Sequence, residues 1–267
     1  MHLNFDFTAG QILWTFSFAA LLVLLVVLMG RDRVRLFPWF TASITLTALR
    51  LLTTRLLFGR MAPFALNSIF IILSLLGVLV SLVVLVELAR HAFSRATRLV
   101  WINATGALLA AGAAVLIVWG PWPAWKAITA DSSLATLRLL QLVSQKTEIL
   151  GDVLAVGLGL LVVFFGRRFN AGWRSHTQQI LIGLSTAAIT QVAILGTLQV
   201  ITPHVLPRSQ AEYLKYQHIL GLQGKLLNAN SAVFLAVIVW WIVCLWINEP
   251  GTEIPAATAE QPTPAEE

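Results

Sequence analysis

Seven long apolar stretches run through the sequence, and they restrict what the chain can fold into. Each has roughly 20 residues or more, the length that a helix needs to cross the hydrocarbon core of a bilayer. Backbone polar groups in lipid must be bonded within the chain, so such stretches cross as helices. Charged residues make up 11% of the chain, against roughly 25% in soluble proteins. The sequence therefore predicts an all-α, polytopic integral membrane protein.

The expected organisation is one transmembrane domain over residues 1–247, followed by a tail. We place its helices near residues 11–30, 37–58, 66–89, 99–119, 137–165, 177–201 and 225–247. A short helix over residues 209–224 is expected to lead into the last one, with Gly221 and Gly224 loosening the junction. Residues 248–267 are rich in Pro, Ala, Thr and Glu. That composition predicts a disordered acidic tail.

The arginines predict the orientation of the seven-helix bundle. Three arginines follow each of the first, third and fifth expected helices: Arg31, Arg33 and Arg35; Arg90, Arg95 and Arg98; and Arg167, Arg168 and Arg174. Basic residues concentrate in cytoplasmic loops, so the N-terminus is expected outside and the C-terminus and tail in the cytoplasm. Met1–Gly10 has no Lys or Arg, the reverse of a secretory signal, so the first helix is expected to be an uncleaved anchor. We expect a multi-pass protein of the cell membrane, with a bacterial cytoplasmic membrane as the favoured site.

Polar residues form a stripe along the fifth expected helix. They recur at spacings of 3, 4, 3 and 4, which places them on one helix face: Arg138, Gln141, Gln145, Glu148 and Asp152. An ionisable residue in the middle of a membrane helix costs roughly 2.5–3.5 kcal/mol on insertion scales. Such a stripe is therefore expected to face the protein interior or a wet cavity.

Polar residues of other helices are expected at the same depth. With a rise of about 1.5 Å per residue, Arg50 and Asp152 both lie roughly 20 Å from the cytoplasmic ends of their helices. The same calculation extends the layer to further side chains in the outer half of the membrane. The predicted site consists of Arg50, Arg55, Gln145, Glu148, Asp152, Gln191, Asn228 and Asn230.

Two interpretations of this layer remain open from the sequence. In the first, Arg50 and Asp152 form a buried ion pair that helps the bundle to assemble. In the second, the layer is a pocket open to the outside that holds a small polar or anionic ligand on Arg50, Arg55 or Lys146.

Separately, Glu87 lies three residues before Arg90, and that spacing predicts a local surface pair.

Missing motifs exclude several classes of protein. No His lies inside an expected span, so a haem bound by two histidines is not expected. The topology resembles that of a rhodopsin, but Lys225 lies near the outer end of the last helix, so the retinal lysine is missing. The sequence has no phosphate loop, no HExxH and no GxSxG. We expect no enzyme, and no catalytic residue, metal or cofactor.

The function favoured by the sequence is a receptor-like or sensory membrane module. In topology the chain resembles the seven-helix sensory modules at the N-terminus of some bacterial kinases and cyclases. A small permease or ion-coupled carrier is the alternative, and a structural subunit of a membrane complex is the third. Expected partners are the lipid bilayer, a small ligand from outside, and a cytoplasmic protein or a second copy of the chain. The small-residue run Gly151, Ala155 and Gly159 favours close helix packing within the bundle, with dimerisation as the second interpretation. The net charge of +6 comes largely from the loop arginines, so nucleic acid is not an expected partner.

Overall fold

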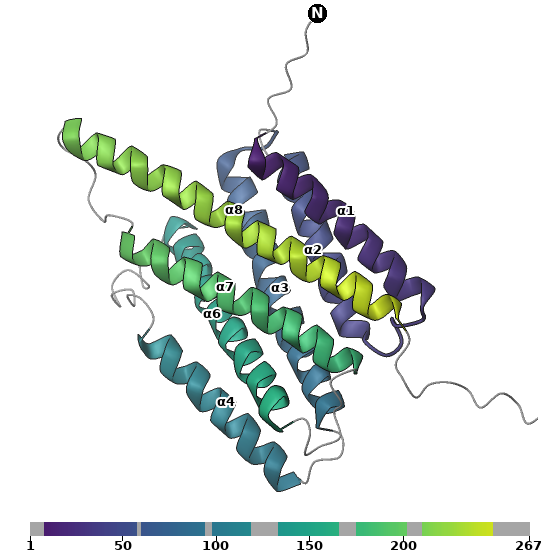
Figure 1. The fold of residues 1–267 in the computed structure, drawn as a ribbon. Helices are drawn as coiled ribbons and strands as arrows, with labels where there is room; N and C mark the ends of the chain where they lie inside the picture. Colours follow the sequence, from purple (N-terminus) through teal and green to yellow (C-terminus); the bar gives the residue numbers. More distant parts are fainter. Residues whose placement is uncertain are drawn as a thin grey trace, which may run out of the picture.

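The computed structural model describes residues 8–57, 60–93, 98–118, 133–165, 175–201 and 210–247. All regular structure in these ranges is helical, which confirms the predicted all-α class (Figure 1). The helices are α1 (Ala9–Gly30), α2 (Pro38–Leu57), α3 (Pro63–Ala92), α4 (Arg98–Val118), α6 (Ser133–Phe165), α7 (His176–Ile201) and α8 (Gln210–Trp246). The predicted tail, residues 248–267, lies outside the described residues.

Five of these helices are long and apolar enough to cross a membrane, so the chain is a multi-pass membrane protein. They comprise Ala9–Gly30, Phe64–Ala92, Leu139–Phe164, His176–Ile201 and Tyr216–Trp246. Of the remaining two helices, α2 carries Arg50 and Arg55, and the described side chains of α4 include the shorter apolar segment Thr105–Val115. Outward-facing apolar side chains such as Val26 and Phe164, 67% and 74% exposed, suit contact with lipid.

The last helix differs from the expected arrangement. A separate short helix before residue 225 was expected, but α8 is one continuous helix from Gln210 to Trp246. Gly221 and Gly224 lie inside it without ending it. A glycine inside a helix costs about 1 kcal/mol relative to alanine, and two of them do not outweigh the helix formers around them. The helix therefore extends past its neighbours at one end of the bundle (Figure 1).

Six helices form a closed ring, and α4 packs on its outside. The ring follows the contacts α1–α2, α2–α3, α3–α6, α6–α7, α7–α8 and α8–α1. The helix α4 packs against α6, and α3 also reaches α7 across the ring (Figure 1). Side chains that point into the ring from different helices can therefore share one interior space.

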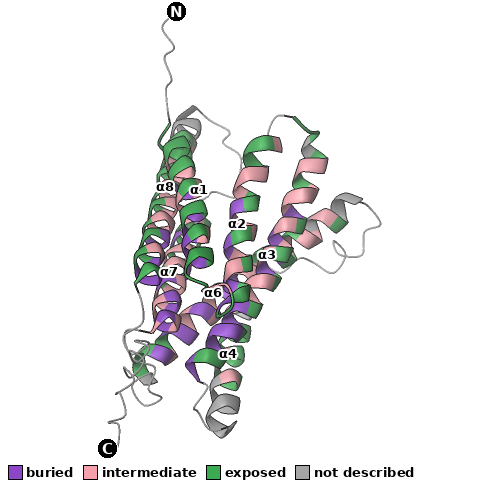
Figure 2. Cartoon of the chain, turned by 90° about the vertical axis from the view of Figure 1, so that its right-hand side faces the viewer, coloured by how far each residue is buried: buried purple, intermediate pink, exposed green. Residues whose placement is uncertain are grey.

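The two halves of the ring are packed differently. We name the half with the C-terminal ends of α1, α3, α6 and α8 the closed half, and the opposite half the open half. Buried side chains concentrate in the closed half (Figure 2). They include Leu24, Leu28, Phe40, Leu88, Ile180, Leu181, Trp241 and Leu245. The Phe40 and Trp241 rings meet edge to face at 5.1 Å, and Gly183 lies directly against the Trp241 indole.

Glu87 holds the start of α2 within the closed half. It is only 8% exposed, and its Oε1 and Oε2 accept hydrogen bonds from the backbone N–H groups of Trp39 and Phe40 at 3.2 and 3.0 Å. The first N–H groups of a helix have no partner within the helix and carry partial positive charge, so a carboxylate stabilises them. The predicted surface pair of Glu87 with Arg90 is therefore wrong, because the stronger partner lies on another helix.

Candidate ligand site

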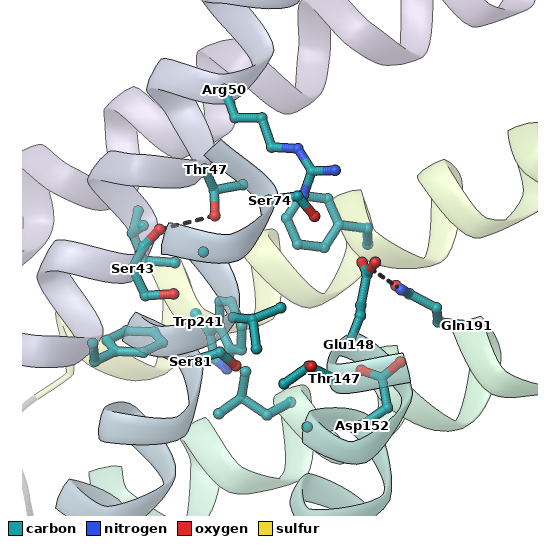
Figure 3. Close-up of a pocket in the computed structure, with 17 residues that line it drawn as sticks. Ser43, Thr47, Arg50, Ser74, Ser81, Thr147, Glu148, Asp152, Gln191 and Trp241 are labelled. Carbon is teal, nitrogen blue, oxygen red and sulfur yellow. Dashed lines mark hydrogen bonds between the residues drawn. The ribbon is translucent and has the colours of Figure 1, made fainter. Parts of the chain in front are cut away.

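A cavity of about 230 Å³ lies inside the ring, between α2, α3, α6, α7 and α8. We name it the central cavity. Phe40 and Trp241 of the closed half line it. Arg50 and Gln191 line it toward the open half (Figure 3). Its polar lining consists of Ser43, Thr47, Arg50, Ser74, Ser81, Thr147, Glu148, Asp152 and Gln191.

A second cavity, of about 500 Å³, lies between α6, α7 and α8. We name it the side cavity. Its polar lining consists of Gln145, Glu148, Gln191, Gln199 and Asn230, and its apolar lining of Ile149, Ile194, Leu195 and Leu227. Glu148 and Gln191 line both cavities. The Gln191 Nε2 donates a hydrogen bond to the Glu148 Oε1 at 3.0 Å (Figure 3), so this contact belongs to the walls of both cavities.

Asp152 lies one turn beyond Glu148 on the same face of α6. Its Oδ2 is buried and has no hydrogen-bond partner. A buried polar atom without a partner costs about 1–3 kcal/mol, and more when it is charged. Such an atom in a cavity wall is a candidate contact for a ligand, an ion or water.

Arg50 projects from α2 into the same cavity without touching Asp152. Within the described ranges, Arg35 pairs with Asp32 on the surface, whereas Arg50 and Asp152 are not within 4.0 Å of each other. The direct Arg50–Asp152 ion pair considered from the sequence is therefore not formed. In the close-up, the Glu148 carboxylate lies between the Arg50 guanidinium and Asp152 (Figure 3). The three charged groups border one space and leave room between them.

The structure brings most of the predicted layer together but separates two members from it. Arg55 lies over the Trp14 ring at 5.9 Å, and Trp14 in turn donates its indole N–H to the Leu51 carbonyl at 3.3 Å. Asn228 lies beside Gly10 of α1. Neither Arg55 nor Asn228 lines either cavity, and neither does Lys146. The side chain of Arg138, at the start of the stripe, lies outside the described residues.

Sequence reasoning missed the hydroxyl groups of the cavity wall. Ser74 and Ser81 of α3 line the central cavity, and Ser74 Oγ accepts a hydrogen bond from Ser144 Oγ of α6 at 2.7 Å. Ser74 and Ser81 lie seven residues apart, with Gly77 between them, in the otherwise apolar middle part of α3, residues 69–86. That spacing marks one helix face and was the signal that could have identified them.

The arrangement offers a guanidinium, two carboxylates, a primary amide and several hydroxyls around a small space. These groups can hold a charged or polar molecule. In the part of the chain that the structure describes, no three His, Cys, Asp or Glu side chains are placed to hold a metal ion. Comparison with protein-family models, curated proteins and solved structures finds no match to this chain.

Proposed function

We propose that the chain is a receptor-like or sensory membrane module that binds a small ligand in the central cavity. In this proposal α2 and α4 also span the membrane, which completes seven spans. The N-terminus and the open half face the outside, and the closed half faces the cytoplasm, in the cell membrane of a bacterium. The arginine distribution supports this orientation. It predicts that cysteines at positions 128 and 206 label from outside intact cells, and those at 93 and 171 only after lysis.

The observation that carries the proposal is the set of three charged groups around one cavity. Charged side chains inside a membrane protein are normally paired with one another or with backbone groups. Glu87 follows this rule, whereas Arg50 and Asp152 border the central cavity without a direct contact. A structural ion pair would close this gap, so the arrangement favours a ligand site.

Phe40 and Trp241 can transmit a change caused by ligand binding from the central cavity to the closed half. Phe40 and Trp241 both line the cavity and contact each other. Trp241 also packs directly against Gly183 of α7. A ligand that draws α2 toward α6 would therefore repack the junction of α2, α7 and α8. We propose that this shift is what a cytoplasmic partner, or a second copy of the chain, detects.

A cavity-filling variant tests the proposal. A Cβ atom added at Gly151, on the wall of the central cavity, meets nothing within 4 Å. Gly151→Leu should fold and occupy the space. A panel of small polar metabolites is screened by the melting temperature of the purified protein. Compounds that raise the melting temperature of the wild type should have no effect on Gly151→Leu.

Gly106→Leu is the matched control, because Gly106 lies on the peripheral helix α4 and also has open space around it. This variant should respond to ligand as the wild type does. Undiminished binding by Gly151→Leu would place the site elsewhere, and a panel without any binder would count against a ligand-binding role.

A small permease is the second candidate, and the side cavity favours it. The side cavity meets the central cavity at the Glu148–Gln191 hydrogen bond, so opening that contact would create a longer path. Uptake of the identified compound by proteoliposomes distinguishes the two candidates. A receptor binds the compound and does not accumulate it inside the vesicle.

A further inference from the structure

We infer that the ligand of the central cavity is a compact zwitterion. Its cationic group would face Asp152 and Glu148, and its carboxylate would face Arg50. This inference rests on the proposed ligand-binding function and names the chemical class that the site would accept.

The carboxylate side of the cavity requires a donor. Asp152 and Glu148 lie four residues apart on one face of α6 and line the same wall. The Asp152 Oδ2 is buried without a donor, and the Glu148 Oε1 accepts a hydrogen bond from the Gln191 amide. An ammonium group offers three N–H donors and a positive charge. An ammonium group would therefore give the Asp152 Oδ2 a hydrogen-bond donor and place a positive charge beside both carboxylates.

The side of the cavity that Arg50 lines requires a hydrogen-bond acceptor. Arg50 is the charged group that α2 presents to the cavity. The hydroxyl of Thr47, one turn earlier, donates to the Ser43 carbonyl within α2 at 2.8 Å. A guanidinium presents several N–H groups in a planar fork that matches a carboxylate. An acidic group on the ligand would therefore bind to Arg50.

Neither charge alone suits this cavity. A simple amine would satisfy the carboxylates but place its remaining atoms against the Arg50 guanidinium. A simple acid would satisfy Arg50 but approach Glu148 and Asp152 with like charge. A zwitterion matches both walls, and Phe234 and Trp241 of α8 offer apolar surface for the carbon atoms between the charges.

The cavity also limits the size of the ligand. Its volume of about 230 Å³ lies just below the range of roughly 300–1,000 Å³ that drug-sized ligands occupy. The space suits a small metabolite. The separation between the two charges of the ligand should therefore determine how well it binds, because Arg50 and Asp152 lie on two different helices, α2 and α6, with α3 between them in the ring.

A series of ω-amino acids of increasing length tests the inference: glycine, β-alanine, γ-aminobutyrate and ε-aminocaproate. Binding is measured by calorimetry on the full-length protein in nanodiscs. One chain length should bind best. Removing its amino group, or replacing its carboxylate with a methyl group, should weaken binding at least tenfold. Asp152→Asn and Arg50→Gln should each weaken binding by a similar factor.

Arg55→Gln is the control, since Arg55 has the same charge on the same helix but lines neither cavity. It should bind as the wild type does. Arg50 is exposed on its helix, so Arg50→Gln keeps the test valid even if Asp152→Asn folds poorly.

Several results would overturn the inference. One is equal binding of the amine or the acid alone, and another is unchanged binding by both site variants. Failure of the whole series would also overturn it. If a non-zwitterionic compound of the metabolite panel binds and Gly151→Leu abolishes that binding, the proposed function stands and only the ligand class is wrong.

Discussion

Two acidic side chains, Glu87 in the closed half and Asp152 in the wall of the central cavity, show how differently two regions of the ring treat buried charge. In the closed half, both carboxylate oxygens of Glu87 accept hydrogen bonds from the first turn of α2. In the wall of the central cavity, the Asp152 Oδ2 is buried and accepts none. A carboxylate with both oxygens hydrogen-bonded stabilises the fold. A carboxylate oxygen that lines a cavity and has no donor is a candidate ligand contact. We therefore expect the closed half to act as the scaffold of the bundle and the central cavity to be the ligand site.

The largest expected effect comes from Glu87. Glu87→Gln removes the charge and turns an amide N–H toward the N–H groups of Trp39 or Phe40. Hydrogen bonds to charged groups contribute roughly 1.5–3 kcal/mol each, so we expect a loss of about 3 kcal/mol in the free energy of unfolding. Reversible unfolding in mixed micelles measures it.

Arg90→Gln is the control for Glu87→Gln. The sequence predicts an ion pair of Glu87 with Arg90, whereas in the structure Glu87 bonds to the start of α2. It should change the unfolding free energy by less than about 0.5 kcal/mol, as surface substitutions usually do. If the two substitutions cost the same, the cap on α2 is not what Glu87 provides.

Alanine substitutions at Gly183 and Gly151 should change the free energy of unfolding in opposite directions. An alanine at Gly183 would place its Cβ against the Trp241 indole, and forcing atoms into a packed core costs typically 1–3 kcal/mol. An alanine at Gly151 meets open space and should stabilise the helix by up to about 1 kcal/mol. Unfolding of the two variants under the same conditions gives the comparison. A loss of stability in both would mean that the central cavity is not open space.

The smallest expected effect is the coupling between Arg50 and Asp152. Because they do not touch, the changes Arg50→Gln and Asp152→Asn should be additive in unfolding free energy, within roughly 0.5 kcal/mol. A double-mutant cycle in the absence of ligand measures this term. A coupling near 3 kcal/mol would instead support a structural ion pair.

The sequence was sufficient to predict the helical fold and the positions of most helices, because long apolar stretches have few alternatives in a membrane. It also located much of the polar layer. Depth follows from the constant rise of a helix, so Arg50, Glu148, Asp152 and Gln191 could be placed at similar heights. They do line one cavity.

Rotation about the helix axis could not be predicted in the same way, because it depends on how each helix packs against its neighbours. Arg55 and Asn228 have suitable depth but lie against Trp14 and beside Gly10. The contact between Glu87 and the start of α2 joins residues 47 and 48 positions apart, so no local pattern predicts it. Contacts of this kind depend on the order of helices around the ring.

The most direct test of the central claim is the water accessibility of the central cavity, compared with that of the closed half. The native Cys244 is the single cysteine of the chain and is buried in the closed half, which gives an internal reference. Thr147→Cys places a second thiol on the wall of the central cavity. A small water-soluble methanethiosulfonate reagent, added outside intact cells, should modify the thiol at position 147 rapidly, leave Cys244 unmodified, and be slowed by bound ligand. A thiol at position 147 that reacts no faster than Cys244 would contradict an open, ligand-accessible cavity.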